Sequence, residues 1–198
     1  WPKSPKHKLV VMGDSLSQGF CNGGMYRTDL SFPAHLARSL GPDIPFEQPS
    51  FTAQAGLPVN LEVLIRGLHD EFGESLEWKE YIPAGSHLIK TLRRIKKYWE
   101  GKFKELKVER TTPYHNQSIW GFGISDAWIV NGEKCSNYIE SYRRTEFNVF
   151  DMLPDTAMYT TARLVLNPAF SPALQFRNIL NNVQHFSEDG GIENLIVC

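Results

Sequence analysis

The sequence predicts an α/β protein, a three-layer α/β/α sandwich with a parallel sheet and a helical insertion. Short apolar runs at residues 8–12 and 194–198 are typical of buried strands, and amphipathic stretches lie between them. Strands that alternate with helices favour a parallel sheet covered by helices on both faces. A chain of 198 residues can bury a sizeable core. We therefore expect residues 1–198 to belong to a single domain.

The first two elements are bounded by turn and cap residues. Residues 8–12 form a compact apolar run that leads into Gly13, which predicts a strand followed by a turn. Residues 32–40 repeat apolar side chains on one helical face. Pro33 suits the first turn of a helix and Gly41 ends it, so a helix is expected here.

Two longer amphipathic stretches follow, at residues 60–72 and 86–106. The second has apolar residues at every third or fourth position, and Ser86 can cap its start. The segment 51–106 is long for one connection between strands, which predicts an inserted helical element.

The second of these stretches is strongly basic, with eight lysines and arginines and two glutamates between residues 86 and 107. Such a helix can lie on an anionic membrane or cover a lipid substrate. The favoured alternative is a helix packed by its apolar stripe with the basic face in solvent. The whole chain has a net charge of −1, which argues against nucleic acid as a partner. Its longest early apolar run is too short for stable membrane insertion.

In the second half, we expect a strand at residues 107–112 and helices at 125–130 and 171–186, with a short apolar run at 164–166. Residues 194–198 predict a buried strand beside the first one. Because a chain rarely stops inside a buried strand, we expect the domain to be incomplete at its C-terminal end. The alternative is a natural edge strand.

The most informative segment lies where the first strand ends, at Gly13, Asp14 and Ser15. Ligands of parallel α/β sheets bind beyond the carboxyl ends of the strands, and a hydroxyl there is placed for acyl transfer. Free backbone N–H groups at a helix start can hold the oxyanion that forms. The alternative is that Asp14 and Ser15 only cap a helix. The G-x-S-x-G elbow and the glycine-rich nucleotide loops do not occur here.

These residues resemble the GDSL, or SGNH, hydrolase family. Gly-Asp-Ser-Leu-Ser at residues 13–17 is similar to the first motif of the family, and residues 32–37 resemble the helix that often follows. A second match covers residues 116–126, with the family's order of Asn, Gly and Asp. The resemblance implies an SGNH-hydrolase, flavodoxin-like fold.

The resemblance also implies roles for four residues. Ser15 would be the nucleophile, and its N–H and that of Gly121 would be oxyanion donors. A residue without Cβ suits Gly121, although Gly123 is a rival for that role. Asp14 and Asn116 are the candidate substrate-binding residues, and Asp14 is also expected to shape the turn.

Two family motifs are missing. The sequence contains neither Gly-x-Asn-Asp nor Asp-x-x-His, and none of its six histidines has an aspartate three positions before it. The family's third oxyanion donor, base and orienting acid therefore have no counterpart. The resemblance covers nearly the whole sequence but only the first part of the family's domain.

The expected function is serine ester hydrolysis through an acyl-enzyme on Ser15. The substrate would be a small-molecule, lipid or carbohydrate ester. The alternative is a binding module that retains the nucleophile loop without catalysis. No metal or organic cofactor is implied, and the three scattered cysteines form no CxxC site.

Overall fold

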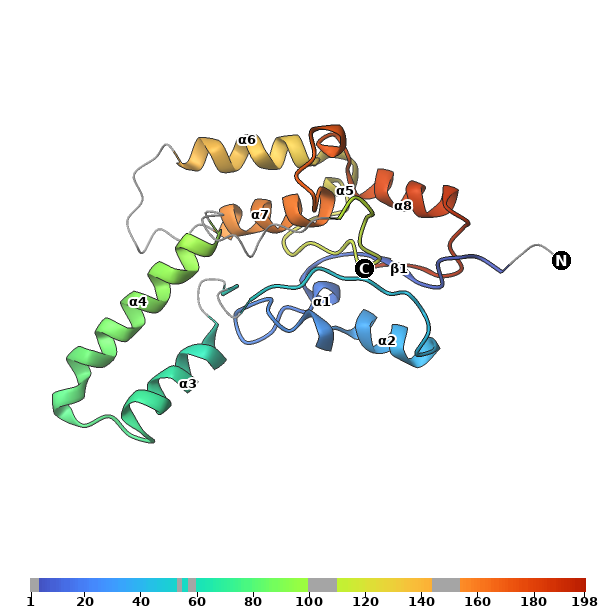
Figure 1. Cartoon of the computed structure of the whole chain (residues 1–198). Coiled ribbons are helices and arrows are strands. Elements are labelled where there is room, and N and C mark those ends of the chain that lie inside the picture. Colours follow the sequence, from blue (N-terminus) through green and yellow to red (C-terminus); the bar gives the residue numbers. More distant parts are fainter. Residues whose placement is uncertain (1–3, 53–54, 57–59, 100–109, 144–153) are drawn as a thin grey trace.

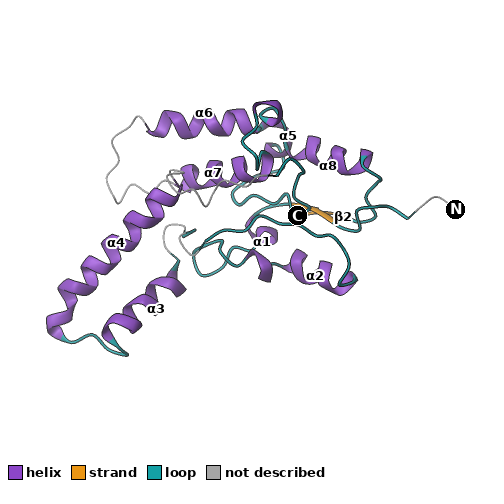
Figure 2. Ribbon diagram, viewed as in Figure 1, coloured by secondary structure: helices purple, strands orange, loops and turns teal. Residues whose placement is uncertain are grey.

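The computed structural model of the chain describes residues 4–52, 55–56, 60–99, 110–143 and 154–198 (Figure 1). Helices make up most of the regular structure, and the sheet is small (Figure 2). The elements, in chain order, are β1 (Val10–Met12), α1 (Ser15–Gln18), η1 (Thr28–Leu30), α2 (Phe32–Leu40), α3 (Leu61–Phe72), η2 (Trp78–Glu80), α4 (Tyr81–Trp99), α5 (Asp126–Ile129), α6 (Gly132–Arg143), α7 (Pro154–Leu166), η4 (Pro172–Leu174), α8 (Ile179–Glu188) and β2 (Leu195–Val197). The chain is therefore a mixed α/β protein, as the sequence predicts.

The sheet consists of two short parallel strands. β1 and β2 pair from Val10 opposite Leu195 to Met12 opposite Val197. The prediction that the first and last strands are neighbours is confirmed. The prediction that the last strand is buried is wrong, because Leu195 is 47% exposed and Val197 is 56% exposed.

A further segment, residues 115–119, runs along the other side of β1. Val11 and Asn116 form a parallel bridge, supported by backbone hydrogen bonds of 2.9 and 2.7 Å between the two segments. β1 thus lies between two parallel neighbours. The strand predicted at residues 107–112 is not found in its described part, since residues 110–112 have no strand structure and 107–109 lie outside the described residues.

The side chains of β1 pack in opposite directions, as the period of a strand requires. Leu9 and Val11 contact Ala37 of α2, whereas Met12 joins a core with Val165 of α7 and Ile179 of α8. Figure 1 shows α1 and α2 on one side of β1, and α5 to α8 on the other. This packing fixes the direction in which the end of β1 leaves the sheet.

The caps of α2 and α3 explain why both helices match their predictions. Ser31 accepts the Ala34 N–H at 3.4 Å, and Gly41 follows the last residue of α2. Asn60 accepts the Val63 N–H at 3.2 Å at the start of α3. Each cap satisfies a backbone N–H that has no partner within the helix.

α4 begins at Tyr81, five residues before the predicted start. A capping box between Glu77 and Glu80 starts a 3₁₀ turn that leads directly into the helix. Ser86 therefore lies inside the helix, and its predicted role as cap is wrong. The predicted end at residue 106 lies outside the described residues.

The C-terminal half of α4 packs into the protein through its apolar stripe. Ile95 and Trp99 are each 2% exposed, in a core cluster with Met25 and Leu164. The favoured alternative for the basic helix is therefore confirmed for residues 95–99, whereas Leu88 of the predicted stripe is 38% exposed. No helix within the described ranges combines the length and hydropathy needed to cross a bilayer.

The helices that cover the second face of β1 were predicted only in part. α5 lies within the predicted 125–130, but α6 and α7 were not foreseen, and the apolar run at 164–166 is the end of α7. The helix predicted at 171–186 is wrong at its start. A 3₁₀ turn occupies the first part, and α8 begins after a capping box at Asn178.

Candidate active site

Three segments present their carboxyl ends at one edge of the sheet. Gly13 extends β1, and its carbonyl accepts the Ile119 N–H at 2.9 Å. The Met12 carbonyl accepts the Cys198 N–H at 3.1 Å. Ligands of parallel α/β sheets bind beyond this edge, which makes it the candidate location of a site.

Gly13 allows the three segments to approach one another closely. A Cβ at this position would lie 2.4 Å from Ser17 Oγ and 2.9 Å from Cys198 Cβ. Both distances are shorter than non-bonded atoms tolerate. Only glycine therefore fits between the first turn of α1 and the end of β2.

Asp14 is the N-cap of α1. Its Oδ1 accepts the Leu16 N–H at 3.0 Å, and its own backbone is extended, with φ −107° and ψ −152°. The carboxylate is thus engaged in the turn that reverses the chain after β1. This geometry favours a role in shaping the turn over contact with a substrate.

Ser15 is the first residue of α1 and is partly exposed at the carboxyl edge. Its carbonyl accepts the N–H groups of Gly19 at 3.2 Å and Phe20 at 3.0 Å, which closes the short helix. Among the residues that the structure describes, none forms a hydrogen bond with the Ser15 hydroxyl or its N–H. Both groups are therefore open to a ligand.

Two buried amides join α1 to the segment that precedes Gly121. Asn116 Nδ2 donates to the Ser17 carbonyl at 2.9 Å, and Gln18 Oε1 accepts the Trp120 N–H at 2.8 Å. Asn116 is 1% exposed, which favours a positioning role over the substrate contact predicted for it. Sequence reasoning missed Gln18, since a glutamine in a first helical turn carries no signal of burial.

Gly121 and Gly123 differ in the state of their N–H groups. The Gly123 N–H donates to Asp126 Oδ2 at 2.7 Å, whereas the Gly121 N–H has no hydrogen-bond partner in the described part of the chain. Gly121 has a φ of +78°, and a Cβ there would lie 2.8 Å from Met158 Sδ. The geometry therefore favours Gly121 as the donor.

A cavity of about 240 Å³ opens at the same edge, between the ends of β1 and β2 and the loop after Gly121. Its walls are mainly apolar. The lining residues are Met12, Gly13, Phe122, Gly123, Ile124, Ala127, Ile179, Val197 and Cys198. A 150 Å³ apolar cavity already accepts a benzene ring, so an apolar group of that size has room here.

The histidines lie elsewhere. All six fall within the described ranges, and none forms a hydrogen bond with Ser15. His7 and His115 lie at the amino-terminal end of the parallel segments, opposite the edge that carries Ser15. No group of three or more His, Cys, Asp or Glu in the described part of the chain is placed to hold a metal ion.

His7 and His115 form a directed chain of hydrogen bonds. The Glu47 N–H donates to His115 Nδ1 at 3.1 Å, so His115 must carry its proton on Nε2 and donate to His7 Nδ1 at 3.1 Å. His7 Nε2 then donates to Asp189 at 3.3 Å. Burial, reinforced by His7, lowers the pKa of His115 to about 4. These hydrogen bonds connect the segment before β1 with Asp189 at the end of α8.

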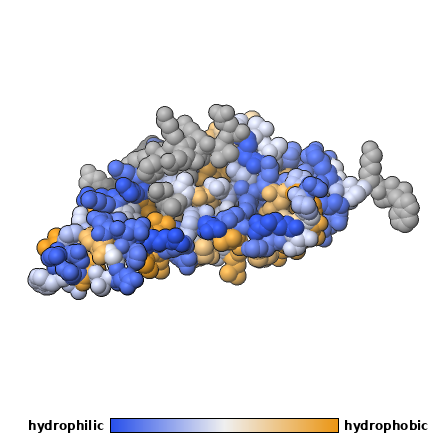
Figure 3. Space-filling view, turned by 60° about the horizontal axis from the view of Figure 1, so that its bottom comes forward, coloured by the Kyte–Doolittle hydropathy of each residue, from blue (hydrophilic) through white to orange (hydrophobic). Residues whose placement is uncertain are grey.

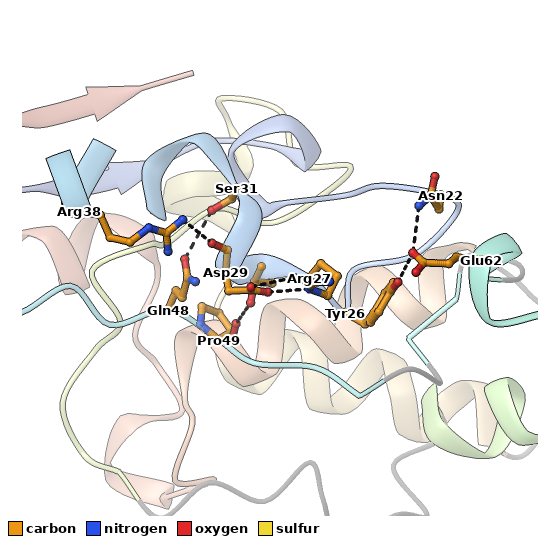
Figure 4. A network of polar contacts seen from close by, with 10 residues as sticks. Asn22, Tyr26, Arg27, Asp29, Ser31, Arg38, Gln48, Pro49 and Glu62 are labelled. Carbon is orange, nitrogen blue, oxygen red and sulfur yellow. Dashed lines mark hydrogen bonds and ion pairs between the residues drawn. The ribbon is translucent and has the colours of Figure 1, made fainter. Parts of the chain in front are cut away.

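The loop after α1 is fixed by a separate polar network (Figure 4). The Tyr26 hydroxyl and the Asn22 amide both donate to Glu62 at the start of α3. Arg27 pairs with Asp29 at 3.1 Å and lowers the pKa of that carboxyl. This network links the loop next to Ser15 with α3, and no motif in the sequence announced it.

Comparisons with protein-family models, curated proteins and solved structures found no match to this chain.

Proposed function

We propose that this chain is a serine ester hydrolase of the GDSL type, with Ser15 as its nucleophile. One observation carries the proposal. The Gly-Asp-Ser turn follows β1 at the carboxyl edge of the sheet, and the Ser15 hydroxyl has no hydrogen-bond partner among the described residues. Two hydrogen bonds, from Asn116 to Ser17 and from Trp120 to Gln18, join α1 to the segment that leads to Gly121. The frame of this site would be the three-layer sandwich expected of the family.

The proposed reaction is acyl transfer. Ser15 Oγ bonds to the carbonyl carbon of the ester and loses its proton to a general base, while the carbonyl oxygen becomes an oxyanion. The N–H groups of Ser15 and Gly121 would donate to that oxyanion. The alcohol leaves with a proton, and water then hydrolyses the acyl-enzyme.

The apolar cavity supports an acyl or aryl group of modest size as the part of the substrate that binds first. Apolar walls with few polar groups are typical of small-molecule sites. The substrate class proposed is therefore a small ester with an apolar acyl group.

A binding module is the second candidate. It is favoured by the absence of a hydrogen bond between Ser15 and any of the six histidines, since a serine without a base is a weak nucleophile. Such a module would bind an ester at the same edge without cleaving it.

The test compares Ser15→Ala with Ser39→Ala in the protein at the length that its gene encodes. Ser39 is an exposed serine of α2 whose hydroxyl donates to the His35 carbonyl. We expect Ser15→Ala to lower turnover of a short aryl ester by roughly 10⁴-fold or more, and Ser39→Ala to leave it unchanged. Ester binding without turnover in the unmodified protein would support the binding module. Equal turnover in both variants would exclude Ser15 as the nucleophile.

A further inference from the structure

α3 and α4 form an arm that projects from the rest of the molecule (Figure 1). Its end exposes large apolar side chains. Trp78 is 88% exposed and Ile82 is 86% exposed. In Figure 3 hydrophobic surface lies among hydrophilic surface at this end. Clustered exposed apolar groups of this kind mark interaction sites.

The arm carries opposite charges at its two ends. Residues 70–80, at the turn between α3 and α4, contain five carboxylates and one lysine, whereas residues 90–97 of α4 contain five basic residues and no acidic one. Carboxylates next to Trp78 would repel an anionic lipid surface. A second arm in the opposite direction would instead place acidic residues beside basic ones.

The outward face of α4 carries apolar residues toward the arm's acidic end and basic residues toward its other end. Ile82, Ile89, Arg93 and Lys97 recur at helical spacing on the side opposite the buried Ile95. The basic side chains of Arg93 and Lys97 form no ion pair with any residue in the described ranges.

If a two-fold axis passes between Gly85 and Ser86, the complementary residues of two copies come together. In that antiparallel register Ile82 faces Ile89, and Trp78 faces Arg93. Small residues at the axis allow close approach, and a Cβ on Gly85 would meet no atom within 4 Å. Lys97 lies one turn beyond Arg93, so it meets the acidic turn before η2, which contains Glu74 and Glu77.

We propose that two copies of this chain associate through the outward faces of their α4 helices, antiparallel and about a two-fold axis. A two-fold interface is self-complementary, so each pair occurs twice. The isoleucines and the stacking of Arg93 on Trp78 provide the affinity. The exposed ion pairs set the register, because each contributes little on its own.

The first test measures association of the whole chain by sedimentation over a range of protein concentrations. We expect a monomer–dimer equilibrium. Ile82→Ser should raise the dissociation constant at least about tenfold, as loss of a central apolar contact does in other interfaces. Ile65→Ser is the matched control, because Ile65 is 63% exposed on α3 but lies outside the proposed interface.

The second test exchanges charges. Glu74→Lys and Lys97→Glu should each weaken the dimer, because each places like charges opposite one another. An equimolar mixture of the two variants, or the double variant, should restore it. Both positions are exposed, so folding is checked by an unchanged thermal melt.

Three results would overturn the proposal. The first is a chain that stays monomeric at all concentrations. The second is equal loss of dimer in Ile65→Ser and Ile82→Ser. The third is a failure of the exchanged charges to restore association. Binding of the monomer to phosphatidylserine vesicles without self-association would identify a membrane as the occupant instead.

Discussion

Gly121 and Gly123 are two residues apart, and their surroundings give them different tolerances for a methyl group. Gly121 has a left-handed backbone, and a Cβ added there would lie 2.8 Å from Met158 Sδ. A Cβ added to Gly123 would lie 3.7 Å from Asp126 Oδ2, which is an ordinary van der Waals distance. Alanine substitutions can therefore distinguish which of the two glycines is the oxyanion donor.

We expect Gly121→Ala to lower ester turnover by up to about 10²–10³, the value of one oxyanion donor, because a Cβ that clashes with Met158 would displace the backbone N–H from its position. It should also lower the free energy of unfolding by about 1–2 kcal/mol, because an L-residue is strained at that φ. Steady-state kinetics and urea unfolding measure the two effects. Gly123→Ala is the control and should be milder in both. If Gly123→Ala were the damaging change, the donor would be the other glycine.

The burial of His115 makes the stability of the fold depend on pH. Its pKa is about 4 in the folded chain, lowered by burial first and then by His7, with Arg110 adding and Glu47 opposing. The ordinary histidine value is near 6.5. Between these values the unfolded chain binds a proton that the folded chain excludes. The stabilising effect is present in full above about pH 6.5 and is lost as the pH falls toward 4.

We therefore expect the free energy of unfolding to fall by up to about 1.4 kcal/mol per pH unit over this range. His115→Gln should flatten that slope in urea unfolding measured from pH 7 to pH 4. His35→Gln, at an exposed position of α2, should retain it. An unchanged slope in His115→Gln would exclude His115 as its source.

Among the elements, those with local end signals were predictable. Ser31 and Gly41 bound α2, and Asn60 begins α3, so the sequence determines both helices through their own caps. α4 was misplaced because Ser86 is also a good cap residue. The capping box at Glu77 and Glu80 lies outside the apolar periodicity and begins the helix earlier.

The segment at residues 115–119 could not be predicted, because its hydrogen bonds depend on partners far away in the chain. It pairs with Val11, and its buried Asn116 reaches Ser17. The position of Ser15 after the end of β1 was predictable, because it follows from a local strand and turn pattern. The hydrogen bond from the Trp120 N–H to Gln18 was not predictable, because it joins residues about a hundred positions apart.

In the molecule as a whole, β1 separates two ends with different chemistry. The carboxyl end has Ser15, Gly121 and the apolar cavity, and the amino end has the histidine chain from Glu47 to Asp189. β2 closes one side of β1 and is itself paired on one side only within the described ranges. The unpaired backbone groups of such an edge can pair with a further strand, from this chain or from a second copy.

The two faces of β2 differ in burial, so substitutions on them should affect association and stability differently. Leu195 is 47% exposed, whereas Ile196 packs on the core with Leu9, Val11 and Ala37. We expect Leu195→Lys to reduce association at the strand edge, because a charged side chain there opposes pairing with another chain. Its effect on the free energy of unfolding should stay within about 0.5 kcal/mol, as is usual for surface positions.

Ile196→Lys is the control on the opposite face and should destabilise the fold, because it places an ammonium group among apolar residues. Light scattering at increasing protein concentration measures the association, and urea unfolding measures the stability. The Ile82→Ser variant is the background for both, because it is expected to weaken association through α4 at least about tenfold. If Leu195→Lys left the scattering of that background unchanged, the open edge of β2 would not be an association surface, and any remaining association would have to arise elsewhere.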